Sequence, residues 1–153
     1  MSAPPCPNPG DFTVEDYLRT PDGPPWYELI EGQLVLEPTP TSGHQGILRD
    51  LSMALFAYLK SAQIGTLLFA PLDVYLNESN VFQPDIRVVM NARRKIITQR
   101  GIRGAPDFVV EILSPSNRAL DRGPKFRVYA QSGVRELWIV DPRERTIESF
   151  VLR

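Results

Sequence analysis

Short apolar runs separated by turn residues dominate the hydrophobic pattern of this chain, and one segment has a long helical repeat. Within residues 42–62, apolar residues recur at helical spacing on one face: Ile47, Leu48, Leu51, Leu55 and Leu59. Ser42 is followed three residues later by Gln45, which matches a capping box. The pattern therefore predicts an amphipathic helix over 42–62, with His44 at its inward-facing start.

The other apolar runs have the length and alternation of β-strands. "WYELIEGQLVLE" predicts two strands joined at Glu31-Gly32, because glycine gives the backbone freedom that a tight turn needs. "TLLFAPLDVYL" and "VFQPDIRVVM" predict a hairpin closed by "NESN". "PDFVVEIL" is almost continuously apolar, which predicts a strand buried on both faces of a sheet. "ELWIV" and "TIESFVL" predict two final strands joined at "DPRE".

Two further helices complete the predicted set. Thr13 can cap a short helix at "VEDYLR", and a second helix is predicted from about Asp121 to Ser132, with Pro124 in its first turn. This succession predicts an α+β (α/β-like) fold in which a mixed β-sheet is flanked by helices. We expect a proline-rich N-terminal segment with the short helix at 1–25 and a single domain at 26–153.

Composition narrows the function classes. The chain has 153 residues, a net charge of −1, one cysteine and one histidine. An internal disulfide and a cysteine-based zinc site are therefore excluded. No apolar run is long enough to span a membrane and no signal peptide is visible, so we expect a cytoplasmic protein without membrane contact. The motifs of serine hydrolases and of P-loop proteins are absent from the sequence.

Charge is distributed unevenly in spite of the near-neutral total. Between residues 87 and 103 the chain carries six basic residues and no acid: Arg87, Arg93, Arg94, Lys95, Arg100 and Arg103. A solvated loop and an electrostatic contact surface for a polyanion explain this run equally well.

Glu111 is a carboxylate inside the apolar strand pattern of "PDFVVEIL", where an unpaired charge would be costly. If the strand containing Asp85 is its neighbour, the two acids can converge and hold a divalent cation such as Mg²⁺. Pairing of Glu111 with Arg87 is the non-catalytic alternative, and a glycosidase carboxylate pair is a less favoured one. Lys125 opens the next predicted helix. It can return towards the acids and stabilise charge there, or extend into solvent.

Several motifs resemble the Uma2 (DUF820) family from about Tyr27 to the end of the chain: "YELIEGQLV", "TSGHQGIL", "QPDIRVV", "GAPDFVVEILSPS" and "DRGPKFRVYAQSGVRELWIVDP". The resemblance implies a restriction-endonuclease-like fold of the PD-(D/E)xK superfamily and a Mg²⁺-dependent nuclease activity. It places Asp85 and Glu111 as the metal-binding acids. The superfamily's usual lysine position is Leu113 here, and the resemblance implies that Lys125 fills this role.

The same resemblance extends to residues around the predicted centre. Glu28 and His44 match further family positions, where they would complete the site or hold its ligands in place. Asp107 is the less favoured ligand. Phosphate contacts are expected from the basic run, at Arg87, Arg93, Arg94 and Lys95.

The expected function is that of an endonuclease that uses Mg²⁺ or Mn²⁺ on nucleic acid, DNA more than RNA. A catalytically inactive binding or regulatory module with the nuclease fold is the rival, and a purely structural homo-oligomer is the third hypothesis. Family members commonly continue past the strand "TIESFVL", whereas this sequence stops at Arg153. We therefore expect a homodimer as one way to cover the sheet edge.

Overall fold

Two mixed β-sheets form the framework of the protein in a computed structural model that describes residues 10–153. The five-stranded sheet has the order β11-β10-β9-β6-β3, and the six-stranded sheet has the order β2-β1-β5-β4-β8-β7. The strands of the first sheet are β3 (Gly65–Phe69), β6 (Ile86–Met90), β9 (Phe108–Ile112), β10 (Glu136–Asp141) and β11 (Thr146–Val151). Those of the second are β1 (Tyr27–Ile30), β2 (Gln33–Leu36), β4 (Val74–Asn77), β5 (Asn80–Phe82), β7 (Ile97–Thr98) and β8 (Gly101–Arg103).

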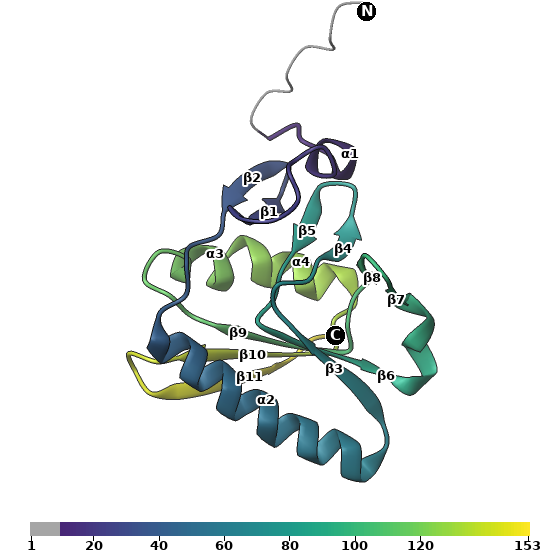
Figure 1. Cartoon of the computed structure of the whole chain (residues 1–153), viewed down its shortest axis with the longest axis vertical. Coiled ribbons are helices and arrows are strands. Elements are labelled where there is room, and N and C mark those ends of the chain that lie inside the picture. Colours follow the sequence, from purple (N-terminus) through teal and green to yellow (C-terminus); the bar gives the residue numbers. More distant parts are fainter. Residues whose placement is uncertain (1–9) are drawn as a thin grey trace, which may run out of the picture.

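Helices cover both faces of the five-stranded sheet (Figure 1). The long helix α2 (Ser42–Ala62) lies on one side, and the short helices α3 (Arg118–Arg122) and α4 (Pro124–Ser132) lie on the other. Val110 and Ile112 of β9 pack in the core cluster that includes Leu48 of α2, whereas Val109 packs in the cluster that includes residues of α4. Because side chains alternate along a strand, Glu111 points to the α4 side. The predicted α+β class with helix-flanked mixed strands is confirmed, with two sheets instead of one.

The predicted hairpin over residues 66–90 is only partly correct, because each of its two arms is broken. β4 and β5 pair in the six-stranded sheet, whereas β3 and β6 pair in the five-stranded sheet. Pro71 and Pro84 lie at the two breaks, and proline has no backbone N–H to donate to a strand partner. The hairpin therefore passes from one sheet to the other, and Asp85 lies at this passage, immediately before β6.

Helix boundaries agree with the sequence patterns better than the predicted caps do. α2 covers the predicted residues, but its cap is Thr41, whose hydroxyl accepts a hydrogen bond from the His44 N–H at 3.2 Å, so the Ser42/Gln45 capping box is wrong. The helix predicted over 121–132 is two helices that meet at Gly123. A Cβ atom on Gly123 would lie 2.8 Å from the Ala119 carbonyl oxygen, so this junction requires glycine.

The N-terminal helix and the basic run also differ in extent from the prediction. α1 (Val14–Tyr17) forms with Thr13 as its cap and a capping box to Asp16, but it ends before "LR". The basic run is not an open loop, because it contains the end of β6, the 3₁₀ helix η1 (Asn91–Ile96), β7 and β8. Within residues 10–153, no helix combines the length and apolar character that crossing a membrane requires.

Candidate functional site

Glu111 is buried on the α4 side of β9, where two donors meet one of its oxygens. Its Oε1 atom lies 2.7 Å from Lys125 Nζ and accepts a hydrogen bond from the Tyr129 hydroxyl at 2.5 Å. The ion-pair partner of Glu111 is therefore a lysine and not Arg87. Burial raises the pKa of Glu111 well above its usual value, and the Lys125 charge offsets only part of this effect.

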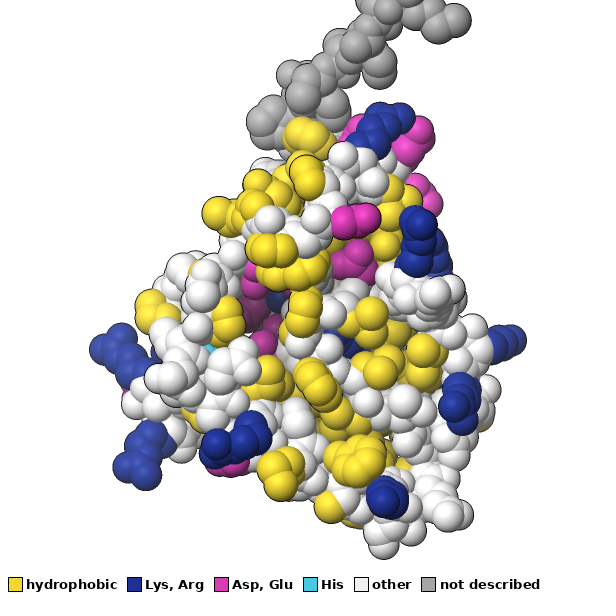
Figure 2. Space-filling model, viewed as in Figure 1, with side chains coloured by type: hydrophobic (Ala, Val, Ile, Leu, Met, Phe, Trp, Pro, Cys, Tyr) yellow, Lys and Arg dark blue, Asp and Glu magenta, His cyan; other side chains and the backbone are white. Residues whose placement is uncertain are grey.

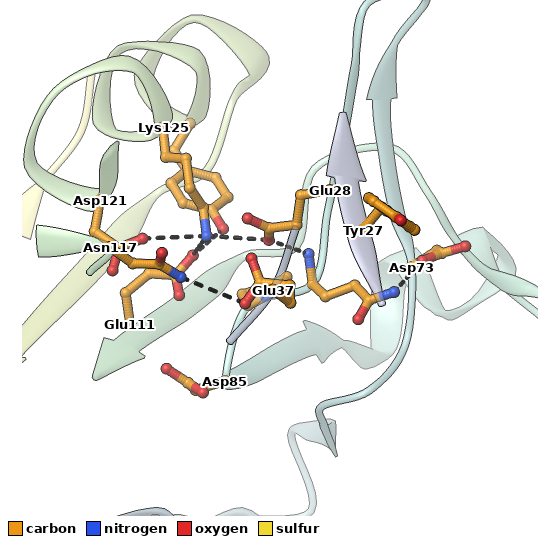
Figure 3. Close-up of polar contacts among 12 residues, drawn as sticks. Tyr27, Glu28, Glu37, Asp73, Asp85, Glu111, Asn117, Asp121 and Lys125 are labelled. Carbon is orange, nitrogen blue, oxygen red and sulfur yellow. Dashed lines mark hydrogen bonds and ion pairs between the residues drawn. The ribbon is translucent and has the colours of Figure 1, made fainter. Parts of the chain in front are cut away.

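Lys125 connects Glu111 to two further carboxylates (Figure 3). Its Nζ atom lies 3.1 Å from Glu28 Oε1 and 3.2 Å from Asp121 Oδ1. The lysine side chain is 4% exposed, so the alternative of a lysine extended into solvent is wrong. Burial opposes its charge, but the three surrounding carboxylates outweigh burial and raise the pKa of Lys125, which keeps the ammonium protonated.

Glu28 and Glu37 bring acids from the six-stranded sheet to this centre. Glu28 on β1 also accepts a hydrogen bond from the Gln83 backbone N–H at 2.5 Å. Glu37 directly follows β2, and Asn117 Nδ2 lies 3.5 Å from its Oε2 atom. Burial and the neighbouring Glu28 carboxylate raise the pKa of Glu37 to about 9. A carboxyl group with such a pKa carries a proton at neutral pH.

Asp85 is held beside Glu111 by the backbone of β9. Its Oδ2 atom accepts a hydrogen bond at 2.7 Å from the N–H of Ile112, the residue after Glu111. The other oxygen, Oδ1, lies 3.2 Å from His44 Nε2 at the start of α2. This hydrogen bond to Asp85 raises the pKa of His44 against the opposing effect of burial. The predicted convergence of Asp85, Glu111, His44, Glu28 and Lys125 therefore occurs in the structure.

We call this group the acid cluster, and it has more carboxylates than cations. Its acids are Glu28, Glu37, Asp85, Glu111 and Asp121, and its cationic groups are Lys125 and His44. Figure 2 shows acidic side chains around a basic one in a hollow on this face of the molecule. An added cation or added protons can balance such an excess of negative charge.

The donor set of the acid cluster fits a hard divalent cation. Mg²⁺ takes oxygen ligands and commonly uses one or two protein carboxylates, with water or phosphate completing its shell. Asp85 and Glu111 supply two carboxylates from adjacent strands. Within the described residues, no three Asp, Glu, His or Cys side chains already lie at metal-ligand spacing. Asp85 and Glu111 would be the protein ligands of such an ion.

Arg87 does not occupy the surface position expected of a phosphate contact. Its side chain is fully buried, with Nη1 donating to the Pro84 carbonyl at 2.7 Å and Nη2 to the Leu72 carbonyl at 3.2 Å. Burial lowers the pKa of Arg87 to about 10. Because both carbonyls lie at the strand breaks, Arg87 ties together the two arms of the interrupted hairpin.

The remaining residues of the predicted phosphate contact lie on η1, away from Arg87. Arg93 Nη1 donates to Asp107 Oδ1 at 3.1 Å, and Asp107 Oδ2 accepts the backbone N–H of Met90 at 2.8 Å. Asp107 thus has structural partners outside the acid cluster. Arg94 and Lys95 are exposed, as a contact with a polyanion would require.

Sequence reasoning missed three members of the centre. Asp121 was predicted only as a helix start and Glu37 as the end of a strand, and Tyr129 was given no role. Asp121 precedes Lys125 by four residues, and this spacing places two side chains on one helical face; here it also holds across the junction of α3 and α4. No comparable local signal links Glu37 or Tyr129 to Glu111.

Comparison with known proteins identifies the family of this chain. The sequence matches the Uma2 family, described as "Putative restriction endonuclease", over residues 14–153. It is 33% identical over 109 residues to an uncharacterized protein of Synechocystis sp., a match that covers 69% of this chain and 55% of the relative. The chain therefore spans about half the length of this curated relative.

A solved structure has the same fold. The crystal structure of "a putative nuclease belonging to DUF820" from Anabaena variabilis superposes with a TM-score of 0.80 at 24% identity, covering 93% of this chain and 80% of the other. The likeness extends over both sheets because it includes nearly all of the chain. This likeness shows the fold, and the match to the family model over residues 14–153 shows that this chain belongs to the Uma2 family.

Proposed function

We propose that the protein is a metal-dependent endonuclease that hydrolyses phosphodiester bonds of nucleic acid at the acid cluster. The observation that carries this proposal is the excess of carboxylates around Lys125 where the two sheets meet. Membership of a family described as "Putative restriction endonuclease" supports the same reaction class. DNA is the substrate we favour over RNA.

Asp85 and Glu111 would hold Mg²⁺ or Mn²⁺. Such an ion polarises the phosphoryl group and lowers the pKa of bound water. The protein orients the two ligands beforehand, because the Ile112 N–H and His44 fix the two oxygens of Asp85, while Tyr129 and Lys125 fix Glu111. His44 and Glu28 thus support the ligands in this proposal and do not react themselves.

Lys125 acts through its charge and not as a base. The surrounding carboxylates raise the pKa of Lys125, so its side chain stays a protonated ammonium near neutral pH and cannot act as a base. Its Nζ atom lies 2.7 Å from Glu111 Oε1, close to where the phosphate would be held. A fixed positive charge there stabilises the negative charge that builds on a phosphate during hydrolysis.

Calorimetric titration with Mn²⁺ and a plasmid nicking assay test the proposal on the same samples. Wild-type protein should bind Mn²⁺ and nick DNA only when Mg²⁺ or Mn²⁺ is present. Glu111→Gln and Asp85→Asn should each weaken Mn²⁺ binding by at least about tenfold, because each removes a charged oxygen ligand. Nicking should fall by at least about a hundredfold in both variants.

Asp107→Asn is the matched control, because Asp107 is as deeply buried as Glu111 but lies outside the acid cluster. It should keep both Mn²⁺ binding and nicking. Nicking that survives in the Asp85 and Glu111 variants would reject the proposed mechanism. Nucleic-acid binding without turnover under any divalent ion, in a folded wild-type sample, would favour the inactive nuclease-fold module.

A further inference from the structure

A second concave site lies beside the acid cluster, at the end of the six-stranded sheet where β1 begins. This pocket has a volume of about 420 Å³, which is within the range of small-molecule sites. Four of its thirteen lining residues are aromatic, although aromatic residues make up only 9% of the chain. They are Tyr17, Trp26, Tyr27 and Tyr75. We call it the aromatic pocket.

A hydrogen-bond network holds the polar floor of the aromatic pocket in place. Asp73 Oδ1 accepts from the Tyr17 hydroxyl at 2.7 Å and from Gln83 Nε2 at 2.8 Å, and Asp73 Oδ2 accepts from the Tyr75 hydroxyl at 3.1 Å. Burial and the Asp73 carboxylate raise the pKa of Tyr75 to about 12, so this hydroxyl keeps its proton. The two tyrosine rings are therefore fixed walls.

Cationic side chains border the aromatic pocket. Arg100 is one of its lining residues and is exposed, and the Arg103 guanidinium carbon lies 4.3 Å from the centre of the Tyr75 ring. Both arginines belong to the basic run of the sequence, at the end opposite to the buried Arg87. Trp26 remains 40% exposed, which leaves its indole ring available to a ligand.

Two short links join the aromatic pocket to the acid cluster. Gln83 donates through its backbone N–H to Glu28 and through its side chain to Asp73, so one residue contacts both sites. Trp26 precedes Glu28 by two residues, and its carbonyl accepts the N–H of Glu37 at 2.8 Å. Figure 3 shows Asp73 and Tyr27 on one side of Glu28, with Lys125 and Glu111 on the other.

We propose that the aromatic pocket binds one unstacked base of a nucleic-acid strand whose neighbouring phosphates reach the acid cluster. The exposed indole ring of Trp26 can stack on a base, and the exposed Arg100 can contact its phosphates, whereas the Tyr17 and Tyr75 rings are buried. Tyr27 of the pocket and Glu28 of the acid cluster point to opposite faces of β1, and Trp26 lies just before this strand. A strand that serves both must bend around the sheet end, which a stiff duplex resists.

The preferred substrate is consequently single-stranded, or a duplex with an unpaired nucleotide. Removing a base from a paired stack costs free energy, and the cost is smallest where the base is already unpaired. This inference rests on the proposed nuclease function for its biological meaning. Base binding itself does not require the metal or any cleavage, so the two proposals can fail separately.

Trp26 fluorescence provides a direct test in EDTA, where no cleavage occurs. The chain has a second tryptophan, Trp138, which is partly buried and packs against Phe108, so the Trp138→Phe variant isolates the signal of Trp26. A short oligothymidylate should quench this signal. An abasic strand of equal length should bind about five- to a hundredfold more weakly, and a blunt duplex should not quench.

Variants of Trp26 and Arg100 distinguish the contribution of base stacking to binding from the contribution of charge. Trp26→Ala should weaken oligothymidylate binding to about the level of the abasic strand, whereas Trp26→Phe should retain most of it. Arg100→Ala should weaken all strands and reduce the salt dependence. Tyr58→Ala removes an even more exposed aromatic ring, which lies on α2, and should change nothing.

Equal affinity for the oligothymidylate and the abasic strand, or full binding by Trp26→Ala, would overturn the aromatic pocket as a base site. If quenching and base dependence are observed but no nicking occurs with Mn²⁺, the base site stands and the nuclease proposal fails. Mn²⁺-dependent nicking at equal rates on single and double strands, without a Trp26 effect, would leave the nuclease proposal and reject this one.

Discussion

Asp141 and Glu111 are buried acids on adjacent parallel strands, yet their surroundings differ in charge balance. Asp141 on β10 accepts hydrogen bonds from Nη1 and Nη2 of Arg118, at 2.7 and 2.9 Å, and from the backbone N–H groups of Arg143 and Glu144. The hydrogen bond from Arg118 is the main reason that its pKa falls to about 2. Glu111 on β9 shares a single lysine with two other acids, and its pKa rises.

The difference shows that burial of an acid does not by itself mark a functional site. Asp141 has more donors than it has oxygens, so its charge is fully satisfied and it can stabilise the turn that follows β10. The acid cluster is the reverse, because its five carboxyl groups outnumber its two cationic groups, Lys125 and His44. In our proposal, a bound divalent cation would offset this deficit of positive charge.

Replacing the cationic residue of each region should lower the free energy of unfolding by very different amounts. Lys125→Met leaves three buried acids without a counter-charge, and the free energy of unfolding should fall by about 3 to 5 kcal/mol at pH 8. The loss should shrink at pH 5, where the acids can protonate. Arg118→Met, in the balanced region, should cost much less. Urea denaturation of both variants measures the contrast, and equal losses would contradict it.

The stability of the protein should fall with rising pH because of the acid cluster. Because the folded pKa of Glu37 is raised to about 9, the folded state holds a proton that the unfolded state has lost above about pH 4.5. Stability should therefore fall as the pH rises towards 9, by at most about 1.4 kcal/mol per pH unit for one proton. Glu37→Gln should flatten this slope in urea midpoints measured without divalent ions. An unchanged slope would mean that Glu37 is already ionised.

The hydroxyl of Tyr129 tests how tightly Glu111 is fixed. Tyr129→Phe removes the hydrogen bond to Glu111 Oε1 but keeps the ring, which packs edge-on against Phe82 at 5.2 Å. The expected loss in the free energy of unfolding is about 1 to 2 kcal/mol at neutral pH. Thermal unfolding measures it. The same experiment on Glu111→Gln and on the double variant shows whether the two losses add, and full additivity would contradict a shared hydrogen bond.

The stability of the protein at acidic pH should depend on the ionisation of Asp141. A pKa lowered to about 2 contributes stability above the unfolded value near 3.9, and this contribution is lost as the pH falls towards 2. The difference in melting temperature between wild type and Asp141→Asn should accordingly be present at pH 5 and shrink by pH 2. A difference that stays constant over this range would show that Asp141 acts through packing and not through charge.

Local sequence patterns predicted much of the fold and part of the acid cluster. The repeat of apolar residues located α2, and alternation located β1, β2, β9, β10 and β11. Charge inside an apolar strand singled out Glu111. The long hairpin was predicted as one unit because strand propensity continues through both prolines, and only pairing with two different sheets shows that its arms are broken.

What the sequence determined by itself is therefore the set of elements, the odd charge on β9 and the family motifs around it. The tertiary structure alone decided that Lys125 meets Glu28, 97 residues away, that Arg87 is internal, and that Glu37 joins the acid cluster. The physical reason is the distance along the chain over which each effect acts. Periodicity and capping act over a few residues, whereas the charge balance of a buried site depends on which distant strands packing brings together.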